Sequence, residues 1–452
     1  MNPRFIPVAA AAIIMAAPMA EADNFFDIEG GDATSVGVYV KELASGKVLV
    51  DHNSALALTP ASVTKAVTTA TALQKLGADW RFTTTVDLSG SRSTATRSCW
   101  NGNLVINASG DPTLESKEFK SNLGFTDSII SSLKRLGISE IQGTVIIKEH
   151  MDDAGPVPQW EVEDLAWEYG AGLYDFNYAG NVVRAYPNTG KTVPASDLKI
   201  TVKPSEDGGT DLIRGINSEN LTVWASAKNR QNQKWNVGTT IPNPAGVYVK
   251  LLTSKLKAAG IKISAKRANS DEASTRVYTH KSPKLQAICQ NLMKRSDNLF
   301  AEGMLRAIKR GDSRSDCIKA EKAYWTDNGV SASRTIINDG SGLTRANRLS
   351  PRFLGDMLEW MAKSPNAATY LDFFPVSGID GTLKSLLAKT RLKGRLAMKT
   401  GSVSSVQCYA GYKLDQAGKP THVVVIMVNG FFCSRAALRK QIENFLLKTF
   451  ED

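Results

Sequence analysis

Three short segments of the chain carry residue types that can together perform nucleophilic acyl transfer. They are Ser62-Val63-Thr64-Lys65, Ser296-Asp297-Asn298 and Lys399-Thr400-Gly401, in that order along the sequence. A serine hydroxyl becomes a nucleophile when a neighbouring base takes its proton. A lysine can be that base if a dry, cation-rich site lowers its pKa. The predicted chemistry is therefore attack by Ser62, with Lys65 as the base.

Each segment alone is a weak signal, and the setting of Ser62 separates it from similar serines. Ser-x-x-Lys also occurs at Ser131, Ser196 and Ser254. Ser62 differs because it begins a predicted helix, so Lys65 lies one turn later on the same face. The N-terminus of that helix adds a positive field that favours a developing oxyanion.

Each segment also has a purely structural interpretation. Ser62 can be an ordinary helix cap with its lysine in solvent, and Ser296 and Asn298 can cap the apolar helix that follows them. Lys399 can be an exposed lysine of an edge strand, with Gly401 marking a close backbone approach. In the catalytic interpretation, this glycine leaves room for a substrate along the strand. The presence of all three segments in this order favours catalysis.

Apolar patterning predicts the elements that position these residues. An amphipathic helix begins after Pro60 and ends at Gly77. The other expected elements are a hairpin over 36–40 and 47–50, helices over 246–259, 284–293, 298–309, 351–362 and 434–449, and strands over 396–402 and 422–428.

The pattern predicts a mixed α/β fold in which both ends of the chain build one domain. Residues 23–82 and 276–452 would form that catalytic domain, an antiparallel sheet flanked by helices. Residues 83–275 have short alternating runs separated by Gly, Asn, Asp and Ser clusters, which predicts an inserted β-rich region of two subdomains. Chain ends that meet in one sheet make such an insertion tolerable.

The first residues have the three-part layout of a secretory signal peptide. Arg4 is followed by an apolar run over 6–19 and by the small residues Ala20 and Ala22. We therefore expect residues 1–22 to be removed, a mature chain that begins at Asp23, and a location in the periplasm or cell envelope. No later segment reaches the roughly 18 apolar residues that span a bilayer.

The composition is that of a globular protein with a basic surface. Of 452 residues, 42% are hydrophobic and the formal net charge is +11. A basic surface favours anionic polymers or an anionic membrane face. Without a recognisable nucleic-acid-binding pattern, no nucleic acid is expected, and anionic wall material is the expected peripheral contact.

Cysteine and histidine usage gives no sign of a metal site. The four histidines lie far apart, and no pair of cysteines has metal-ligand spacing. An exported protein could join four of its five cysteines, but their pairing cannot be read from sequence. The cysteines are Cys99, Cys289, Cys317, Cys408 and Cys433. We expect no metal and no cofactor.

The three segments and several others together resemble one family. The Ser-x-x-Lys, Ser-Asp-Asn and Lys-Thr-Gly set is found in penicillin-binding proteins and β-lactamases. Further similar segments are Leu58–Lys65, Gly110–Leu114, Asp339–Arg345, Gly378–Leu383, Lys399–Ser402 and Ala410–Tyr412. With the long insertion between the first two motifs, the chain resembles the low-molecular-mass class C penicillin-binding proteins, of the penicillin-binding protein 4 type.

This resemblance implies a β-lactamase/transpeptidase-like fold and a serine D-alanyl-D-alanine carboxypeptidase or D,D-endopeptidase. Its substrates would be peptidoglycan stem peptides, and β-lactams would inhibit it. Lys65 would take the proton of Ser62, and Asn298 would bind the substrate amide and orient the base lysine. Ser296 would relay a proton to the leaving nitrogen, helped by the positive charge of Lys399. The implied substrate-binding residues are Thr400, Gly401 and Ser402, with the N–H groups of Ser62 and Ser402 as the oxyanion hole.

Three alternatives differ in class. A class A β-lactamase needs a deacylating glutamate in Glu-x-x-x-Asn, and Glu302, Glu321 and Glu359 all lack the asparagine. A serine esterase of the same fold and a catalytically silent wall-binding protein stay open. The balance of carboxypeptidase and endopeptidase activity, the stem-peptide preference, the role of the insertion and the oligomeric state cannot be read from the sequence.

Overall fold

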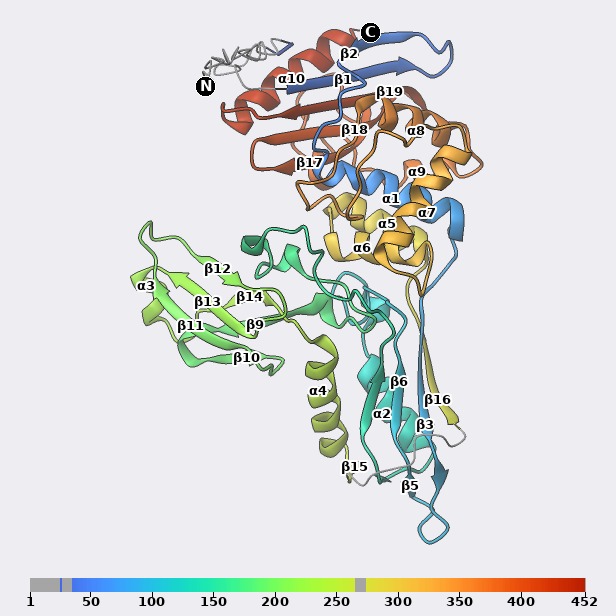
Figure 1. Ribbon diagram of the computed structural model, residues 1–452, viewed down its shortest axis with the longest axis vertical. Helices are drawn as coiled ribbons and strands as arrows, with labels where there is room; N and C mark the ends of the chain where they lie inside the picture. Colours follow the sequence, from blue (N-terminus) through green and yellow to red (C-terminus); the bar gives the residue numbers. More distant parts are fainter. Residues whose placement is uncertain (1–24, 27–34, 265–273, 452) are drawn as a thin grey trace, which may run out of the picture.

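The computed structural model describes residues 25–26, 35–264 and 274–451 (Figure 1). The predicted signal peptide over 1–22 and the expected new N-terminus at Asp23 lie outside the described residues.

A five-stranded antiparallel sheet joins the two ends of the chain. Its order is β17-β18-β19-β1-β2, with β1 paired to β19 from Ser35 opposite Asn429 to Glu42 opposite His422. The strands are β1 Ser35–Glu42, β2 Val48–His52, β17 Leu396–Val403, β18 Val406–Leu414 and β19 Pro420–Asn429. The predicted hairpin and strands are therefore present, and β17 is an edge of this sheet.

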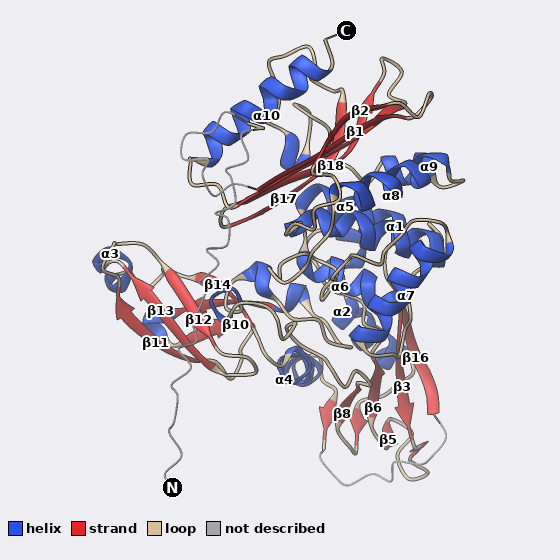
Figure 2. Ribbon diagram, turned by 45° about the horizontal axis from the view of Figure 1, so that its top comes forward, coloured by secondary structure: helices blue, strands red, loops and turns tan. Residues whose placement is uncertain are grey.

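Helices cover both faces of this sheet because its strands alternate apolar side chains between them (Figure 2). In β19, Val424, Ile426 and Val428 face helix α10, while Val423 and Val425 face the helix cluster around α1. The helices are α1 Thr64–Leu76, α5 Leu285–Arg295, α6 Asn298–Ala307, α7 Arg314–Asp327, α8 Pro351–Lys363, α9 Ala367–Leu371 and α10 Arg435–Thr449.

Helix α1 differs from the amphipathic helix that its sequence predicts. It is buried from Thr64 through Leu73, with other elements on all sides. Its polar side chains are satisfied inside the protein: Thr68 Oγ1 donates to Gly340 O at 2.9 Å, and Thr71 Oγ1 donates to Val67 O at 2.9 Å. The polar side chains between Thr64 and Leu73 therefore contact other protein groups and not solvent. Gly77 ends the helix as predicted.

The chain leaves and re-enters the region between the catalytic motifs through two paired strands. β3 and β16 are antiparallel, from Thr83 opposite Lys281 to Ser89 opposite Ser274. They belong to the sheet β16-β3-β6-β8, beside the sheet β15-β7-β5-β4. The elements of this part are β3 Thr83–Ser89, β4 Ser91–Arg92, β5 Cys99–Asn101, β6 Leu104–Asn107, β7 Glu140–Ile141, β8 Val145–Lys148, β15 Lys262–Ile263, β16 Ser274–Lys281, α2 Phe125–Arg135 and α4 Pro244–Ala258.

Two three-stranded sheets form a further part, seen at the left of Figure 1. Their orders are β10-β9-β14 and β11-β13-β12, with apolar side chains such as Leu212, Leu221 and Val223 buried beneath them. The elements are β9 Val182–Tyr186, β10 Lys191–Val193, β11 Lys199–Pro204, β12 Asp211–Arg214, β13 Asn220–Ala225, β14 Val237–Thr240 and α3 Ala227–Gln231. The domain boundaries at 83 and 275 and the division into two subdomains stay a prediction.

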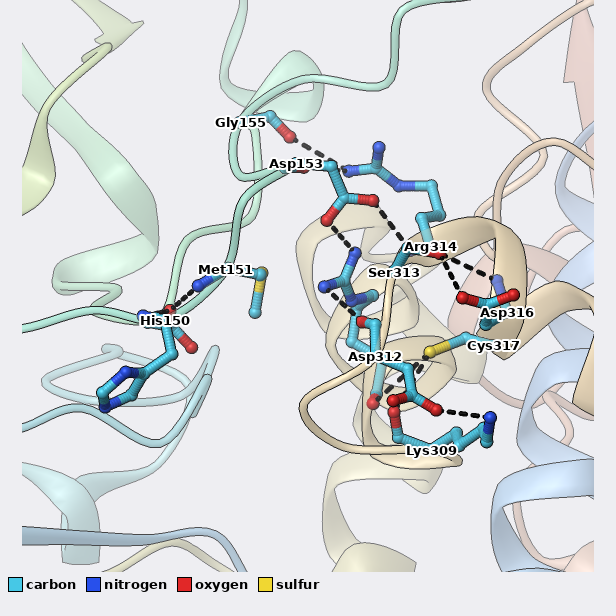
Figure 3. Close-up of polar contacts among 12 residues, drawn as sticks. His150, Met151, Asp153, Gly155, Lys309, Asp312, Ser313, Arg314, Asp316 and Cys317 are labelled. Atoms are coloured by element: carbon cyan, nitrogen blue, oxygen red, sulfur yellow. Dashed lines mark hydrogen bonds and ion pairs between the residues drawn. The ribbon is translucent and has the colours of Figure 1, made fainter.

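A charged contact attaches the segment after β8 to the helices of the catalytic motifs (Figure 3). Asp153 accepts hydrogen bonds from the guanidinium of Arg306, in α6, and from the backbone N–H of Arg314, which begins α7, the latter at 2.7 Å. Burial opposes ionisation of Asp153, but these two donors and the nearby positive charges hold its pKa below the usual range.

The five cysteines do not form the two disulfides that an exported chain would allow. Cys289, Cys317 and Cys408 are buried free thiols, and Cys433 is a half-buried one. Within residues 25–26, 35–264 and 274–451, no helix is long and apolar enough to cross a membrane. In the same part of the chain, no group of three His, Cys, Asp or Glu side chains is placed to hold a metal ion.

Candidate active site

Ser62 lies in a tight turn that leads into the buried helix α1. The turn is a 3-10 helix, Ala61–Val63, and α1 follows directly at Thr64. Ala61 has a φ of 48°, in the left-handed region that non-glycine residues rarely occupy. Such a conformation persists only when the surrounding structure holds it in place. The serine is therefore presented by a strained turn and not by a regular first helical turn.

Two glycines allow other segments to touch this turn. A Cβ on Gly401, in β17, would lie 2.5 Å from Pro60 O and 3.1 Å from Ser62 N. A Cβ on Gly342 would lie 1.9 Å from Ala61 O. The close-approach explanation of Gly401 is thus right: the backbone from Pro60 to Val63 fills the space beside it, and the absence of a side chain lets β17 lie against the turn that holds Ser62.

Lys65 is fully buried and hydrogen-bonds three oxygens. Its Nζ donates to Ser62 Oγ at 2.8 Å, to Asn298 Oδ1 at 2.6 Å and to Ser341 O at 2.5 Å. Burial lowers the pKa of Lys65 to about 8, although the carboxylates of Asp339, Glu302 and Asp297 oppose the shift. This lysine is therefore in contact with the serine and close to losing its proton. The interpretation of Lys65 as a solvated side chain is wrong.

The second motif occupies the junction between α5 and α6. Ser296 ends α5 with a φ of 64°, and Asp297 caps α6 by accepting from Phe300 N at 2.9 Å. Asn298 is the first residue of α6, and its Nδ2 donates to Tyr169 O at 2.8 Å. The capping explanation of Ser296 and Asn298 is wrong, because Asp297 makes the cap and leaves their side chains for the site.

Lys399 is also fully buried, so it is not an exposed edge-strand lysine. Its Nζ donates to Ser296 Oγ at 3.0 Å and to Thr400 O at 2.6 Å. Burial, together with the charge of Lys65, holds the pKa of Lys399 well below its usual range. Thr400 Oγ1 donates to Thr382 Oγ1 at 2.9 Å. The two lysines thus lie on either side of the serines, one bonded to each hydroxyl.

A cavity of about 330 Å³ opens over Ser62. Ser62, Ser296, Asn298 and Ser402 line it, so the structure brings residues of the first two predicted segments and the residue after the third to one surface. The other lining residues are Asp164, Tyr169, Gly342, Leu343, Arg345, Val403 and Ser404.

Sequence reasoning missed the contribution of the inserted region to this cavity. Asp164 and Tyr169 come from the short 3-10 helices Val162–Asp164 and Glu168–Gly170, and the Tyr169 hydroxyl donates to Asp164 Oδ1 at 2.9 Å. Arg345, which also lines the cavity, pairs with Glu161 of the same inserted segment at 2.5 Å. No spacing or pattern near residue 164 indicated a site, because these side chains reach the motifs only through the tertiary fold.

A second, larger cavity adjoins the first. Its volume is about 490 Å³, and Tyr169, Ser296 and Asn298 line both cavities. Its walls carry charges of both signs, from Glu168 and Arg184 of the inserted region and from other residues. The space in contact with the catalytic motifs is therefore larger than the cavity over Ser62 alone.

Comparison with models of protein families decides the identity of this arrangement. Residues 27–448 match the model of the D-Ala-D-Ala carboxypeptidase 3 (S13) family. The chain belongs to the S13 family. The expected resemblance to penicillin-binding proteins of the penicillin-binding protein 4 type is confirmed, and S13 members are serine-type carboxypeptidases.

Named relatives of this S13 chain are similar over most of their length. It is 25% identical over 430 residues to the D-alanyl-D-alanine carboxypeptidase DacB of Haemophilus influenzae, covering 88% of this chain and 86% of that protein. It is also 25% identical over 434 residues to a D-alanyl-D-alanine carboxypeptidase of an Actinomadura species, covering 86% of this chain and 77% of that protein.

A solved structure confirms the fold class of this S13 chain. The crystal structure of penicillin binding protein 4 from Haemophilus influenzae superposes with a TM-score of 0.77 at 23% identity, covering 93% of this chain and 97% of that one. The mixed α/β, transpeptidase-like architecture with a large β-rich insertion is thus as predicted.

Proposed function

We propose that this S13 protein hydrolyses the D-Ala-D-Ala ends and D,D cross-links of peptidoglycan stem peptides through an acyl-enzyme on Ser62. The observation that carries the proposal is the 2.8 Å hydrogen bond between the buried Lys65 Nζ and Ser62 Oγ. A base in contact with a hydroxyl, at the floor of an open cavity, is the arrangement that nucleophilic catalysis requires.

In the acylation step, Ser62 Oγ attacks the carbonyl carbon of the penultimate D-Ala while its proton moves to Lys65. This transfer requires the neutral amine, and a pKa of about 8 leaves part of the lysine neutral near pH 7. The N–H groups of Ser62 and Ser402 would stabilise the oxyanion. Because β17 is an edge of its sheet, its outer backbone groups can pair with the extended substrate.

In the leaving-group step, the C–N bond breaks, the departing nitrogen takes a proton from Ser296 Oγ, and Ser296 takes up the proton that Lys65 received from Ser62, so that Lys65 is neutral again. Lys399 supports this transfer, since its Nζ already donates to that oxygen at 3.0 Å. Thr400 and Ser402 would bind the terminal carboxylate with Lys399. Water then attacks the ester carbonyl and gives a proton to Lys65, which passes that proton to Ser62 Oγ as the acyl group departs.

Asn298 would orient both the base and the substrate. Its Oδ1 accepts from Lys65 and one hydrogen of its Nδ2 is used by Tyr169 O, which leaves the second hydrogen for a substrate carbonyl.

The same site should form a long-lived adduct with β-lactams. A penicillin G-acylated endopeptidase from Bdellovibrio bacteriovorus has the same fold, with a TM-score of 0.53 at 16% identity. In this chain, Glu302 and Glu321 are buried, and Glu359 pairs with Lys41 at 2.6 Å. None of these glutamates lines the cavity over Ser62. This supports slow release of the acyl group, in contrast to a β-lactamase.

For the protein in its cell we propose export through the signal peptide over 1–22, a place in the periplasm, and contact of the basic surface with anionic wall material. Salt tests the last point, because the Debye length falls to about 3 Å at 1 M ionic strength. Binding to purified sacculi that is equally strong at low and high salt would contradict an electrostatic contact.

The proposed function is tested by incubating the purified protein with a fluorescent penicillin and mapping the adduct by mass spectrometry. We expect a stable adduct on Ser62, and release of D-Ala or cleavage of cross-links from purified muropeptides. Rapid loss of the label would indicate a β-lactamase. No label and no muropeptide product would indicate a wall-binding protein, and hydrolysis of simple esters alone would indicate an esterase.

A further inference from the structure

Glu302 is a buried carboxyl group close enough to Lys65 to act on its charge. It lies one helical turn after Asn298 in α6, so both side chains lie on the same side of the helix. The residue is 1% exposed. The sequence indicated only that Glu302 lacks the pattern of a deacylating glutamate, and no part of the mechanism above uses it. Burial of a carboxyl group is costly unless it has partners.

The partners of Glu302 are backbone groups of the loop over 339–342. Its Oε1 accepts from Gly340 N at 3.0 Å and from Ser341 N at 2.9 Å. The carbonyl of the same Ser341 accepts from Lys65 Nζ at 2.5 Å. One peptide segment thus connects the carboxyl group to the base: its N–H groups bind Glu302 and its C=O binds Lys65.

Asp339 holds the other end of this loop. Its carboxylate accepts from Gly342 N at 2.8 Å, from Thr344 N at 2.9 Å and from Asn347 Nδ2 at 2.7 Å. In Glu302 only one carboxyl oxygen is hydrogen-bonded, because its Oε2 has no hydrogen-bond partner among the described residues. Glu302 therefore combines a loop contact with an oxygen that is neither solvated nor bonded.

The charged groups around this pair come from four parts of the fold. Asp339 of the loop and Arg314 of α7 act on Glu302, and Glu321 of α7 lies close to the same group. Asp297 at the start of α6 acts on Lys65, and Lys399 of β17 lies close enough to be affected by it. Burial raises the pKa of Glu302 to about 7, with Asp339 adding to the shift.

We propose that Glu302 is a positioning residue for Lys65: it holds the Ser341 carbonyl on the lysine and supplies negative charge that favours the protonated amine. The inference rests on the proposed function, in which neutral Lys65 activates Ser62. When Glu302 is neutral, Lys65 gives up its proton more readily, so the carboxyl group controls the pH above which Ser62 is activated.

Glu302→Gln tests the charge while keeping the shape. The amide oxygen can still accept from Gly340 and Ser341, but the side chain can no longer ionise. We expect the acid limb of the pH profile for penicillin acylation to move to lower pH, by on the order of one pH unit. Glu302→Ala also removes the loop contact and should lower the acylation rate at every pH.

Glu321→Gln is the matched control, since it removes a second buried carboxyl group that makes no hydrogen bond to the 339–342 loop in the described structure. Without the negative charge of Glu321, Glu302 ionises more easily, and an ionised Glu302 favours the protonated form of Lys65. Any movement of the acid limb should therefore be toward higher pH. An unshifted profile in a folded, acylating Glu302→Gln protein would overturn the inference. Failure of the wild-type protein to acylate would instead overturn the proposed function.

Discussion

Asn429, at the end of β19, hydrogen-bonds both backbone polar groups of Thr59. Its Oδ1 accepts from Thr59 N at 2.7 Å, and its Nδ2 donates to Thr59 O at 3.1 Å. Cys408 Sγ also lies 3.5 Å from the Thr59 carbonyl. Since Thr59 precedes the strained turn of Ser62, a side chain from the C-terminal part of the sheet completes the bonding of the nucleophile segment.

Asn429→Ala should therefore impair acylation as well as stability. A backbone N–H left without a partner costs about 1–3 kcal/mol, and the turn at Ala61 would lose part of its support. We expect a lower unfolding temperature and slower labelling by fluorescent penicillin. Asn236→Ala, which removes a half-buried side chain bonded to Arg184, should change neither quantity. Equal labelling rates for the two variants would show that Asn429 does not support the turn.

Gly401→Ala should displace β17 from the nucleophile. The new Cβ would lie 2.5 Å from Pro60 O and 2.9 Å from Val63 N, both backbone atoms that cannot move aside alone. Overpacking of this kind costs about 1–3 kcal/mol, and we expect acylation to fall more steeply than stability. Gly215→Ala is a suitable control, because its Cβ would meet only Ser218 Cβ, at 3.6 Å. Wild-type labelling by Gly401→Ala would contradict the assigned contact.

Ser62 and Lys65 should behave as one catalytic unit. Ser62→Ala removes the acylated oxygen and Lys65→Ala removes its base, so each change alone should abolish the penicillin adduct. The double variant should hydrolyse muropeptides scarcely more slowly than either single variant, because residues that act together are strongly non-additive. Steady-state rates for the three variants give the comparison. Additive losses, or an adduct on another serine, would remove the basis for this assignment.

Acylation should rise with pH as Lys65 loses its proton. Only the neutral amine accepts the proton of Ser62, and burial lowers the pKa of Lys65 to about 8. Below that value the neutral fraction grows about tenfold per pH unit, so the rate should climb between about pH 6 and pH 8 and then level off. Stopped-flow labelling measures this profile. Lys65→Arg keeps a positive charge throughout and should be inactive at every pH tested.

Asp153→Ala should weaken the attachment of the inserted region. The side chain of Arg306 is 7% exposed, and removing its carboxylate partner leaves a buried charge without compensation. Because Asp164 and Tyr169 follow in the same segment, we expect a higher KM for stem peptides, with a smaller change in penicillin acylation. Asp316→Ala removes a more exposed carboxylate that pairs with Lys319 and serves as the control. Identical KM values for the two variants would argue against this role.

The local elements were predictable because their patterns are local. Apolar spacing predicted the hairpin, α4, α5, α8, α10, β17 and β19. The three motifs were enough to predict that Ser62, Ser296 and Lys399 share one site. Helix α7, Arg314–Asp327, was missed because its buried residues Cys317, Glu321 and Trp325 lie within a mostly polar segment. The roles of Ser341 and Tyr169 could not be predicted either, since each contributes a backbone carbonyl. Every residue type has a backbone carbonyl, so the sequence does not distinguish one that has a role.

The pairing of β1 with β19 also bears on when the chain can become active. Synthesis delivers the N-terminal segment first, yet the neighbour of β1 in the sheet is β19, near the opposite end of the chain. Contacts of such large sequence separation form slowly. Until β19 arrives, β1 has only β2 beside it, and Asn429 cannot support the segment before Ser62. A nascent or truncated chain that lacks β19 would therefore contain all the proposed catalytic residues but not the side chain that supports the turn of Ser62. This hydrolase would gain activity only when its last strand is added.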